Sequence, residues 1–307
     1  MSQNISVDAG HGYVKALSTT GERVLFPSLI APAPTGPDLG RFGSQAVVVL
    51  DGEKYLVGDD ARRSTGSLFS KEKATDPLTI AITKIAAAKA AGPGYHIVNL
   101  GVGLPLSWYA SQKDALAAAL TATATVDDCH LMIKSVSVFP QGIGALVSVG
   151  DLPWVGLVGL VDIGYRTVDF VVAEVRDGMP QPLTQYAGTY PGGMHIAFQS
   201  IAQALESETQ VRFEPHELNA DRETVTANGR QITLDPFRAF AFEALAGDLS
   251  RHLAITWDGV MDKLDRLYLA GGGAIALSPY LSGLSAVRIL PDSQWANAQG
   301  FLSLLDG

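Results

Sequence analysis

At 307 residues, the chain is long enough for one large domain or two domains of ordinary size. The hydrophobic fraction of 47% beside 17% charged residues is typical of a globular protein with a large core. The net charge of −9, without a basic run longer than Arg62-Arg63, argues against direct binding to nucleic acid, and the single Cys129 excludes an internal disulfide and a cysteine zinc cluster.

The start of the chain does not resemble a secretory signal. "MSQNISVDAG" has no basic residues and meets Asp8 before any apolar stretch forms. The longest clean apolar run near the middle, "WVGLVGLV", is far too short to span a bilayer. We therefore expect a cytoplasmic protein with no membrane contact.

The first predicted element is a hairpin in "SVDAGHGYVKALS", residues 6–18, where an apolar lead meets Asp8 and two glycines. Such a turn either reverses the strand tightly or lets backbone N–H groups close on a phosphate. A carboxylate beside a phosphate needs a cation, so Asp8 would anchor hydrated Mg²⁺ and Lys15 would reach a phosphate oxygen. The alternative is that Asp8 only caps the turn.

The next elements complete a first α/β half. A Pro- and Gly-rich insertion at about 28–75 contains a hairpin around Asp51-Gly52, followed by a helix over 79–91, a strand over 95–105 and a helix over 106–120. The stretch "VFPQGIGALVSVG", 138–150, places Pro140-Gln141-Gly142 between a strand and a small-residue helix. The amide of Gln141 can orient a water but cannot accept a proton, which favours hydrolysis over transfer to a hydroxyl. A helix cap is the alternative role.

The second half repeats the first. "LVDIGYRTVDFVV", 160–172, again reads as strand, Asp-x-Gly turn and strand, so that Asp162 and Gly164 match Asp8 and Gly10. A polar insertion at about 207–236 contains a second hairpin around Asn228-Gly229, and a long helix over 237–259 follows it. We predict two α/β domains, 1–150 and 151–307, around a cleft, each with a small inserted subdomain.

The last motif is "LAGGGA", in which Gly271, Gly272 and Gly273 end a strand and open a helix. Glycines there let a flat ring or a phosphate lie against the backbone. A glycine hinge is the alternative.

Taken in order, these motifs resemble the actin-like ATPase superfamily, which contains actin, Hsp70-type chaperones and sugar kinases. They are Asp8-x-Gly-x-Gly-x-x-Lys15, Pro140-Gln141-Gly142, Asp162-x-Gly164 and Gly271-Gly272-Gly273. Within it, "KYLVGDDARR", "YPGGMHIAFQSIAQAL" and "PDSQWANAQGFLSL" look most like the ParM/StbA branch of plasmid segregation. The resemblance implies a duplicated α/β fold of the ribonuclease H-like type around a nucleotide cleft.

The resemblance also implies a role for each motif. Asp8 and Asp162 would hold Mg²⁺ through water, Gln141 would position the attacking water, and Asp169 would lie near that water. The residues implied in nucleotide binding are Gly10, His11, Gly12, Lys15, Gly164, Tyr165, Arg166, Gly192, Gly193, Gly271, Gly272 and Gly273. The bulky Tyr165-Arg166 pair departs from the small residues common in that turn, and His11 departs from the family pattern too.

The function implied is a cytomotive ATPase that polymerises with ATP and Mg²⁺ and disassembles after hydrolysis, reaching plasmid DNA through a small adaptor protein. GTP in place of ATP stays open, because glycine backing does not distinguish the two bases. A small-molecule kinase of the same superfamily, with Asp169 as base, is one alternative. A nucleotide-binding filament scaffold with little hydrolysis is another.

Overall fold

The computed structural model describes residues 2–34, 46–62, 72–218, 222–281, 283–284 and 286–306. The chain forms two compact units, the first made of Met1–Ser148 with Asn297–Gly307 and the second of Val149–Ala296. The sequence analysis assigned all of 151–307 to the second domain, whereas residues 297–307 belong with the first unit. None of the described helices has both the length and the apolar character needed to cross a membrane.

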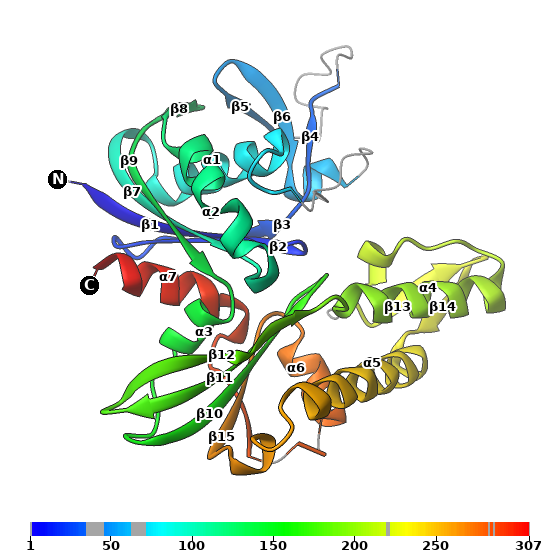
Figure 1. Ribbon diagram of the computed structural model, residues 1–307. Helices are drawn as coiled ribbons and strands as arrows, with labels where there is room; N and C mark the ends of the chain where they lie inside the picture. Colours follow the sequence, from blue (N-terminus) through cyan, green and yellow to red (C-terminus); the bar gives the residue numbers. More distant parts are fainter. Residues whose placement is uncertain are drawn as a thin grey trace. The chain divides into compact units, whose positions relative to one another are not determined.

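The first unit is built on a mixed nine-stranded sheet in the order β3-β2-β1-β7-β9-β8-β5-β6-β4 (Figure 1). Its strands are β1 (Gln3–Ala9), β2 (Tyr13–Ser18), β3 (Arg23–Pro27), β4 (Ile30–Pro32), β5 (Val47–Leu50), β6 (Glu53–Val57), β7 (Gly94–Leu104), β8 (Thr123–Val126) and β9 (Cys129–Pro140). Its helices are α1 (Pro77–Ala91), α2 (Leu106–Leu120), α3 (Ile143–Val147) and α7 (Ala296–Asp306), with the 3₁₀ turn η2 (Gly58–Ala61).

The alternation along β1 explains why helices cover both faces of this sheet. Ile5 and Val7 point to one face, where they join a buried cluster with Ile82 and Ile85 of α1. The residues between them point to the other face, where Ser6 donates to the Ala298 carbonyl of α7 at 2.7 Å. Because side chains alternate along a strand, Asp8 lies on the same face as Ser6.

The predicted hairpin around Asp51-Gly52 is confirmed as β5–β6, with Leu50 opposite Glu53. Both turn residues have positive φ, 50° and 89°, as a two-residue hairpin turn of type I′ requires. This hairpin and β4 extend the edge of the large sheet. Residues 35–45 and 63–71 of the predicted 28–75 insertion lie outside the described residues.

The second unit has a five-stranded sheet in the order β12-β11-β10-β15-β16 and a separate two-stranded sheet. Its strands are β10 (Gly156–Ile163), β11 (Val168–Arg176), β12 (Met179–Tyr190), β13 (Thr224–Ala227), β14 (Arg230–Thr233), β15 (Arg266–Ala270) and β16 (Val287–Ile289). Its helices are α4 (Met194–Thr209), α5 (Asp235–Thr256) and α6 (Ala274–Leu277), with 3₁₀ turns at Pro215–Leu218, Met261–Lys263, Ser278–Tyr280 and Ser293–Trp295.

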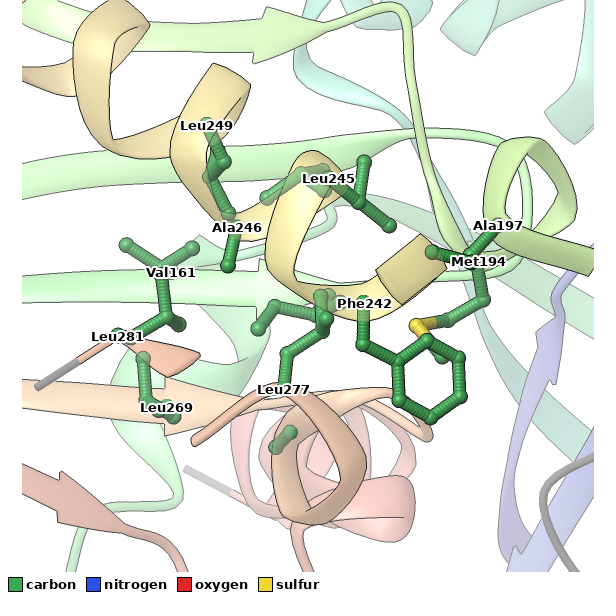
Figure 2. Packing of buried hydrophobic residues seen from close by; sticks show 14 of the residues in the cluster. Val161, Met194, Ala197, Phe242, Leu245, Ala246, Leu249, Leu269, Leu277 and Leu281 are labelled. Carbon is green, nitrogen blue, oxygen red and sulfur yellow. The ribbon is translucent and has the colours of Figure 1, made fainter. Parts of the chain in front are cut away.

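The core of the second unit lies between one face of this sheet and α4, α5 and α6. Figure 2 shows Val161 of β10 and Leu269 of β15 among side chains of α5 and α6, with Phe242 beside Met194 of α4. The predicted hairpin around Asn228-Gly229 is confirmed as β13–β14, again with both turn residues at positive φ. Of the predicted 207–236 insertion, residues 219–221 lie outside the described residues.

The internal duplication seen in the sequence is matched strand for strand. β1 pairs antiparallel with β2 and parallel with β7, just as β10 pairs antiparallel with β11 and parallel with β15. In the first hairpin Asp8 lies opposite Lys15, and in the second Asp162 lies opposite Asp169. The two predicted motifs therefore occupy the same place in equivalent hairpins.

Candidate functional site

In the first unit, the carboxylate of Asp8 is held from two sides. Lys15, its partner in the β1–β2 register, donates from Nζ to Oδ2 at 3.0 Å, and the two side chains are only 11% and 5% exposed. The amide Nε2 of Gln141 donates to Oδ1 at 2.7 Å, from 133 residues further along the chain. The structure thus brings together three residues that the sequence analysis placed in one site.

Gln141 reaches Asp8 because its backbone is fixed on both sides. Its N–H donates to the Leu104 carbonyl at 2.8 Å. The next residue, Gly142, and then Ala145 donate from their N–H groups to Oδ1 of Asn297 in α7, at 3.0 and 3.1 Å. Asn297 therefore caps the N-terminus of α3, where the helix leaves backbone donors without partners of its own.

The glycine turn after β1 is closely packed. A Cβ on Gly10 would lie 3.0 Å from the Tyr13 carbonyl oxygen and 3.3 Å from the Lys15 ammonium nitrogen, so the position is tight for any other residue. The ring of His11 packs edge-on against Trp108 of α2, with the centroids 5.8 Å apart. Gly12 accepts at its carbonyl from the Ser28 N–H at 3.0 Å.

In the second unit, the β10–β11 turn carries a pair of buried carboxylates. Asp162 and Asp169 lie directly opposite each other on adjacent strands and are 7% and 3% exposed. Thr189 of β12 donates from Oγ1 to Asp169 Oδ1 at 2.5 Å. Facing side chains in such a register are close neighbours, and two carboxylates there favour a bound cation.

The predicted glycines of the second unit gather around this same turn. A Cβ on Gly193 would lie 2.6 Å from the carbonyl oxygens of Gly164 and Tyr165, and one on Gly271 would collide with the Asp162 carboxylate. Gly273 donates from its N–H to the Ile163 carbonyl at 2.9 Å. Close backbone approach is thus what requires glycine at Gly193 and Gly271.

The two remaining glycines of these motifs lie at the margins of the cluster. Gly192 is next to Tyr190 and Ile196, and a Cβ there would lie 2.5 Å from the Tyr190 ring. Gly272 faces Gln294, whose nearest atom would be 3.8 Å away from such a Cβ. Gly272 is therefore the glycine of "LAGGGA" with the most room beside it.

The bulky pair at the tip of the turn is packed against the start of α4. The N–H of His195 donates to the Tyr165 carbonyl at 2.8 Å, and its Nδ1 lies 3.0 Å from the same oxygen, which makes Nδ1 a donor. Burial raises the pKa of the Tyr165 hydroxyl and lowers the pKa of the Arg166 guanidinium. Burial, and then the positive charge of Arg166, lower the pKa of His195.

Several residues in contact with the predicted motifs were missed from the sequence. Lys73 donates from Nζ to the Ala9 carbonyl at 2.7 Å, and Ser28 donates from Oγ to the Gly10 carbonyl. Asn297 and Thr189 support Gln141 and Asp169 as described above. Asn297 lies in the stretch "PDSQWANAQGFLSL" but was not singled out there, and the other three lie outside the motifs. Each acts from a distant part of the chain, and Lys73, Ser28 and Asn297 are buried polar residues.

The chemistry of the two turns fits a hydrated Mg²⁺ with phosphates. Each offers a buried carboxylate at the end of a strand, next to glycine backbone; Lys15 contacts Asp8 in the first, and the second turn contains Arg166 in its sequence. Among the described residues, no three His, Cys, Asp or Glu side chains group as a metal site.

Comparison with known proteins now decides the family. The family model "Actin like proteins N terminal domain" matches residues 6–144, and "Archaeal actin homologue MreB-like, C-terminal" matches residues 160–283. This chain belongs to the actin-like protein family. The two matches follow the order of the two units and include both Asp-x-Gly turns of the actin-like chain.

Individual actin-like proteins match over nearly the whole length. An archaeal actin homolog of Thermoplasma volcanium is 26% identical over 97% of both chains. A ParM filament from Clostridium botulinum has a TM-score of 0.86 at 21% identity, covering 99% of this chain and 98% of that one. An archaeal actin homolog in complex with ADP has a TM-score of 0.81 at 21% identity, covering 99% of both. The predicted resemblance and the actin-like fold are confirmed.

Proposed function

We propose that this actin-like protein binds ATP with Mg²⁺, hydrolyses the ATP, and assembles into filaments whose stability depends on the bound nucleotide. The observation that carries the proposal is the repeated hairpin with its buried carboxylate beside glycine backbone, present once in each unit. An ADP complex of an archaeal actin homolog supports nucleotide as the ligand. The ParM filament supports self-assembly.

Asp8 and Asp162 are the proposed anchors of Mg²⁺, through its water shell. When bound, the metal would neutralise charge on the phosphates and so favour attack by water. Lys15 stands 3.0 Å from Asp8 and would bring a positive charge to the phosphates. Gly10, His11 and Gly12 in the first unit, and Gly164, Tyr165 and Arg166 in the second, would face phosphate oxygens.

Gln141 is the proposed water-positioning residue. Its amide lies against Asp8, and its backbone is fixed by Leu104 and by the capped start of α3. The Gln141 amide would hold and orient the attacking water, while Gln141 itself takes no proton. Asp169, fixed by Thr189, is the residue proposed to orient that water or receive its proton.

The remaining glycines are proposed to line the nucleoside. Gly192 and Gly193 precede α4, and Gly271, Gly272 and Gly273 precede α6. Of these five glycines, Gly272 has the most room beside its backbone for a flat ring. Glycine backbone lying against the base would not distinguish adenine from guanine. We propose ATP as the main nucleotide and test GTP beside it.

Assembly would be coupled to nucleotide by linkage. A subunit that binds ATP better in its filament-competent state also polymerises better when ATP is bound, and hydrolysis removes that advantage. Head-to-tail contacts that do not close a ring give an open filament. With a net charge of −9, we propose that plasmid DNA is reached through a small basic adaptor protein, not directly.

The test is light scattering of the purified protein, read in parallel with phosphate release, after adding Mg²⁺ with ATP, GTP or a non-hydrolysable ATP analogue. We expect scattering that rises with ATP and decays as phosphate appears, and a lasting rise with the analogue. Hydrolysis without assembly, stimulated by an added metabolite, would instead indicate a small-molecule kinase. Assembly without hydrolysis would indicate a scaffold.

Asp162→Asn tests the metal role within the same assay. Loss of the carboxylate charge should lower Mg²⁺-dependent phosphate release at least about tenfold, because the cation loses an anchor. The control is Asp258→Asn, a change at an exposed carboxylate outside both turns. Normal turnover and assembly by Asp162→Asn would remove Asp162 from the metal site.

A further inference from the structure

Lys73 is a buried lysine that the motifs did not single out. It lies in a turn just before α1, where the Glu72 carbonyl accepts from the N–H groups of Thr75 and Asp76. Asp76 then caps α1 by accepting from the Thr79 N–H at 2.8 Å. The Lys73 backbone is therefore held firmly, its side chain is 4% exposed, and Nζ donates to the Ala9 carbonyl at 2.7 Å.

The Lys73 contact fixes the direction of one peptide plane in the glycine turn. In a trans peptide the carbonyl and the following N–H point in opposite directions. With the Ala9 carbonyl directed to Lys73, the Gly10 N–H faces the opposite way. The next plane follows the same logic, since the Gly10 carbonyl accepts from Ser28 Oγ and the His11 N–H faces away from Ser28.

Backbone N–H groups of a glycine turn are the donors from which concave anion sites are built. An ammonium donor makes a stronger hydrogen bond to a carbonyl than a neutral donor does. Without Lys73, the Ala9–Gly10 plane loses the contact that orients it. Ser28 holds the neighbouring plane by a neutral hydroxyl and should contribute less.

We propose that Lys73 is a positioning residue for the nucleotide phosphates, acting by orienting the Gly10 N–H toward them. This assignment rests on the proposed nucleotide binding and adds to it a residue from outside every motif of the turn. It also makes a selective prediction. Lys73 should matter for ligands that carry a diphosphate and not for the nucleoside alone.

The experiment measures binding of ADP with Mg²⁺ and of adenosine by calorimetry to the wild type and to Lys73→Met, Lys73→Arg and Ser28→Ala. We expect Lys73→Met to bind ADP about tenfold more weakly while adenosine affinity stays within about twofold. Lys73→Arg, which keeps a cationic donor, should recover part of the loss. Ser28→Ala should lose about threefold for ADP alone. The matched control is Lys89→Met, at an exposed position in the last turn of α1.

Three results would overturn the assignment. Equal losses for ADP and adenosine would show that Lys73 acts only through folding, and unchanged ADP affinity would show that it does not act on the phosphates. If Lys73→Met fails to fold, as judged by its thermal unfolding, Ser28→Ala decides: an unselective or absent effect overturns the orientation of this turn. A wild type that binds no ADP would overturn the proposed function itself.

Discussion

The contact between Gln141 and Asp8 makes the clearest prediction about a single side chain. Replacing Gln141 with alanine removes the amide but leaves Lys15 on the other carboxylate oxygen, so binding of nucleotide should survive. We expect kcat for phosphate release to fall at least about tenfold while KM for ATP stays within about threefold. Gln203→Ala, on the exposed face of α4, is the control. A larger change in KM than in kcat would assign Gln141 to binding instead.

His195 predicts how stability depends on pH. Burial and Arg166 lower its folded pKa below the ordinary 6.5, so the unfolded chain takes up the proton first as the pH falls. The stabilisation from neutral His195 is complete above pH 6.5 and is lost as the pH drops through 6.5 toward the lowered folded pKa. Between pH 7.5 and 5, the free energy of unfolding measured in urea should therefore fall more steeply for the wild type than for His195→Gln. Parallel curves would contradict this assignment.

The sequence identified the motif residues at the ends of strands well, but it did not identify the distant residues that contact them. Asp8, Asp162 and the glycines stand in short local patterns whose backbone needs can be read directly, such as close approach at Gly193 and Gly271. Lys73 and Asn297 carry no such pattern, because their partners lie 64 and 155 residues away. Long-range contacts depend on how elements pack, and no local spacing records that.

The crossing of α3 and α7 depends on two glycines in direct backbone contact. A Cβ on Gly300 would collide with the Gly144 carbonyl, and a Cβ on Gly144 would collide with the buried ring of Phe301. Both helices therefore approach as closely as their backbones allow. Since α3 follows Gln141 directly, this crossing also sets where Gln141 lies.

Two glycine-to-alanine changes on helices should have opposite effects. Gly300→Ala should lower the free energy of unfolding by at least about 1–3 kcal/mol, because backbone must move to make room. In Gly247→Ala on α5, the new Cβ would meet only the flexible end of Arg251, at 3.6 Å. This change should raise the free energy of unfolding by about 0.5–1 kcal/mol, because alanine has the higher helix propensity. Urea unfolding measures both. A neutral Gly300→Ala would show that the two helices can separate at little cost.

One helix and both two-residue hairpin turns were predicted closely. The helix expected over 106–120 is α2, and both two-residue hairpins have the positive φ values that Asp-Gly and Asn-Gly favour. The helix expected after "LAGGGA" is only Ala274–Leu277 before it passes into a 3₁₀ turn. Pro279 explains the break, since it cannot continue the α-helical hydrogen bonds.

For the whole chain, the main departure from the sequence prediction is α7. A simple duplication predicts that each half of the sequence forms one unit by itself. Instead, α7 follows the second half in the sequence and packs in the first unit. Asn4 donates to the Leu305 carbonyl at 3.2 Å and to Asp306 Oδ1 at 2.6 Å, and Phe301 is fully buried. Figure 1 shows α7 beside β1. Nothing in a repeat pattern identifies the half to which the helix following it belongs.

A chain ending at Ala296 should therefore lose the first unit and keep the second. Without α7, Gly103 and Gly144 lose the ring of Phe301 and α3 loses its cap from Asn297. Hydrogen exchange should show amides of β1 and β7 becoming unprotected, while those of β10 and β15, in the core of the second unit, stay protected. Equal protection in both units would contradict the assignment of α7 to the first unit.

The placement of α7 also has a consequence for synthesis on the ribosome. Residues 149–296 emerge before α7 does, so the second unit can reach its final fold while the first still lacks the helix that covers Ser6 and caps α3. At about 5–20 residues per second, that delay amounts to roughly seven to thirty seconds. During it, the glycine-lined face around Gly101 and Gly103 stays open to chaperones and to other nascent chains.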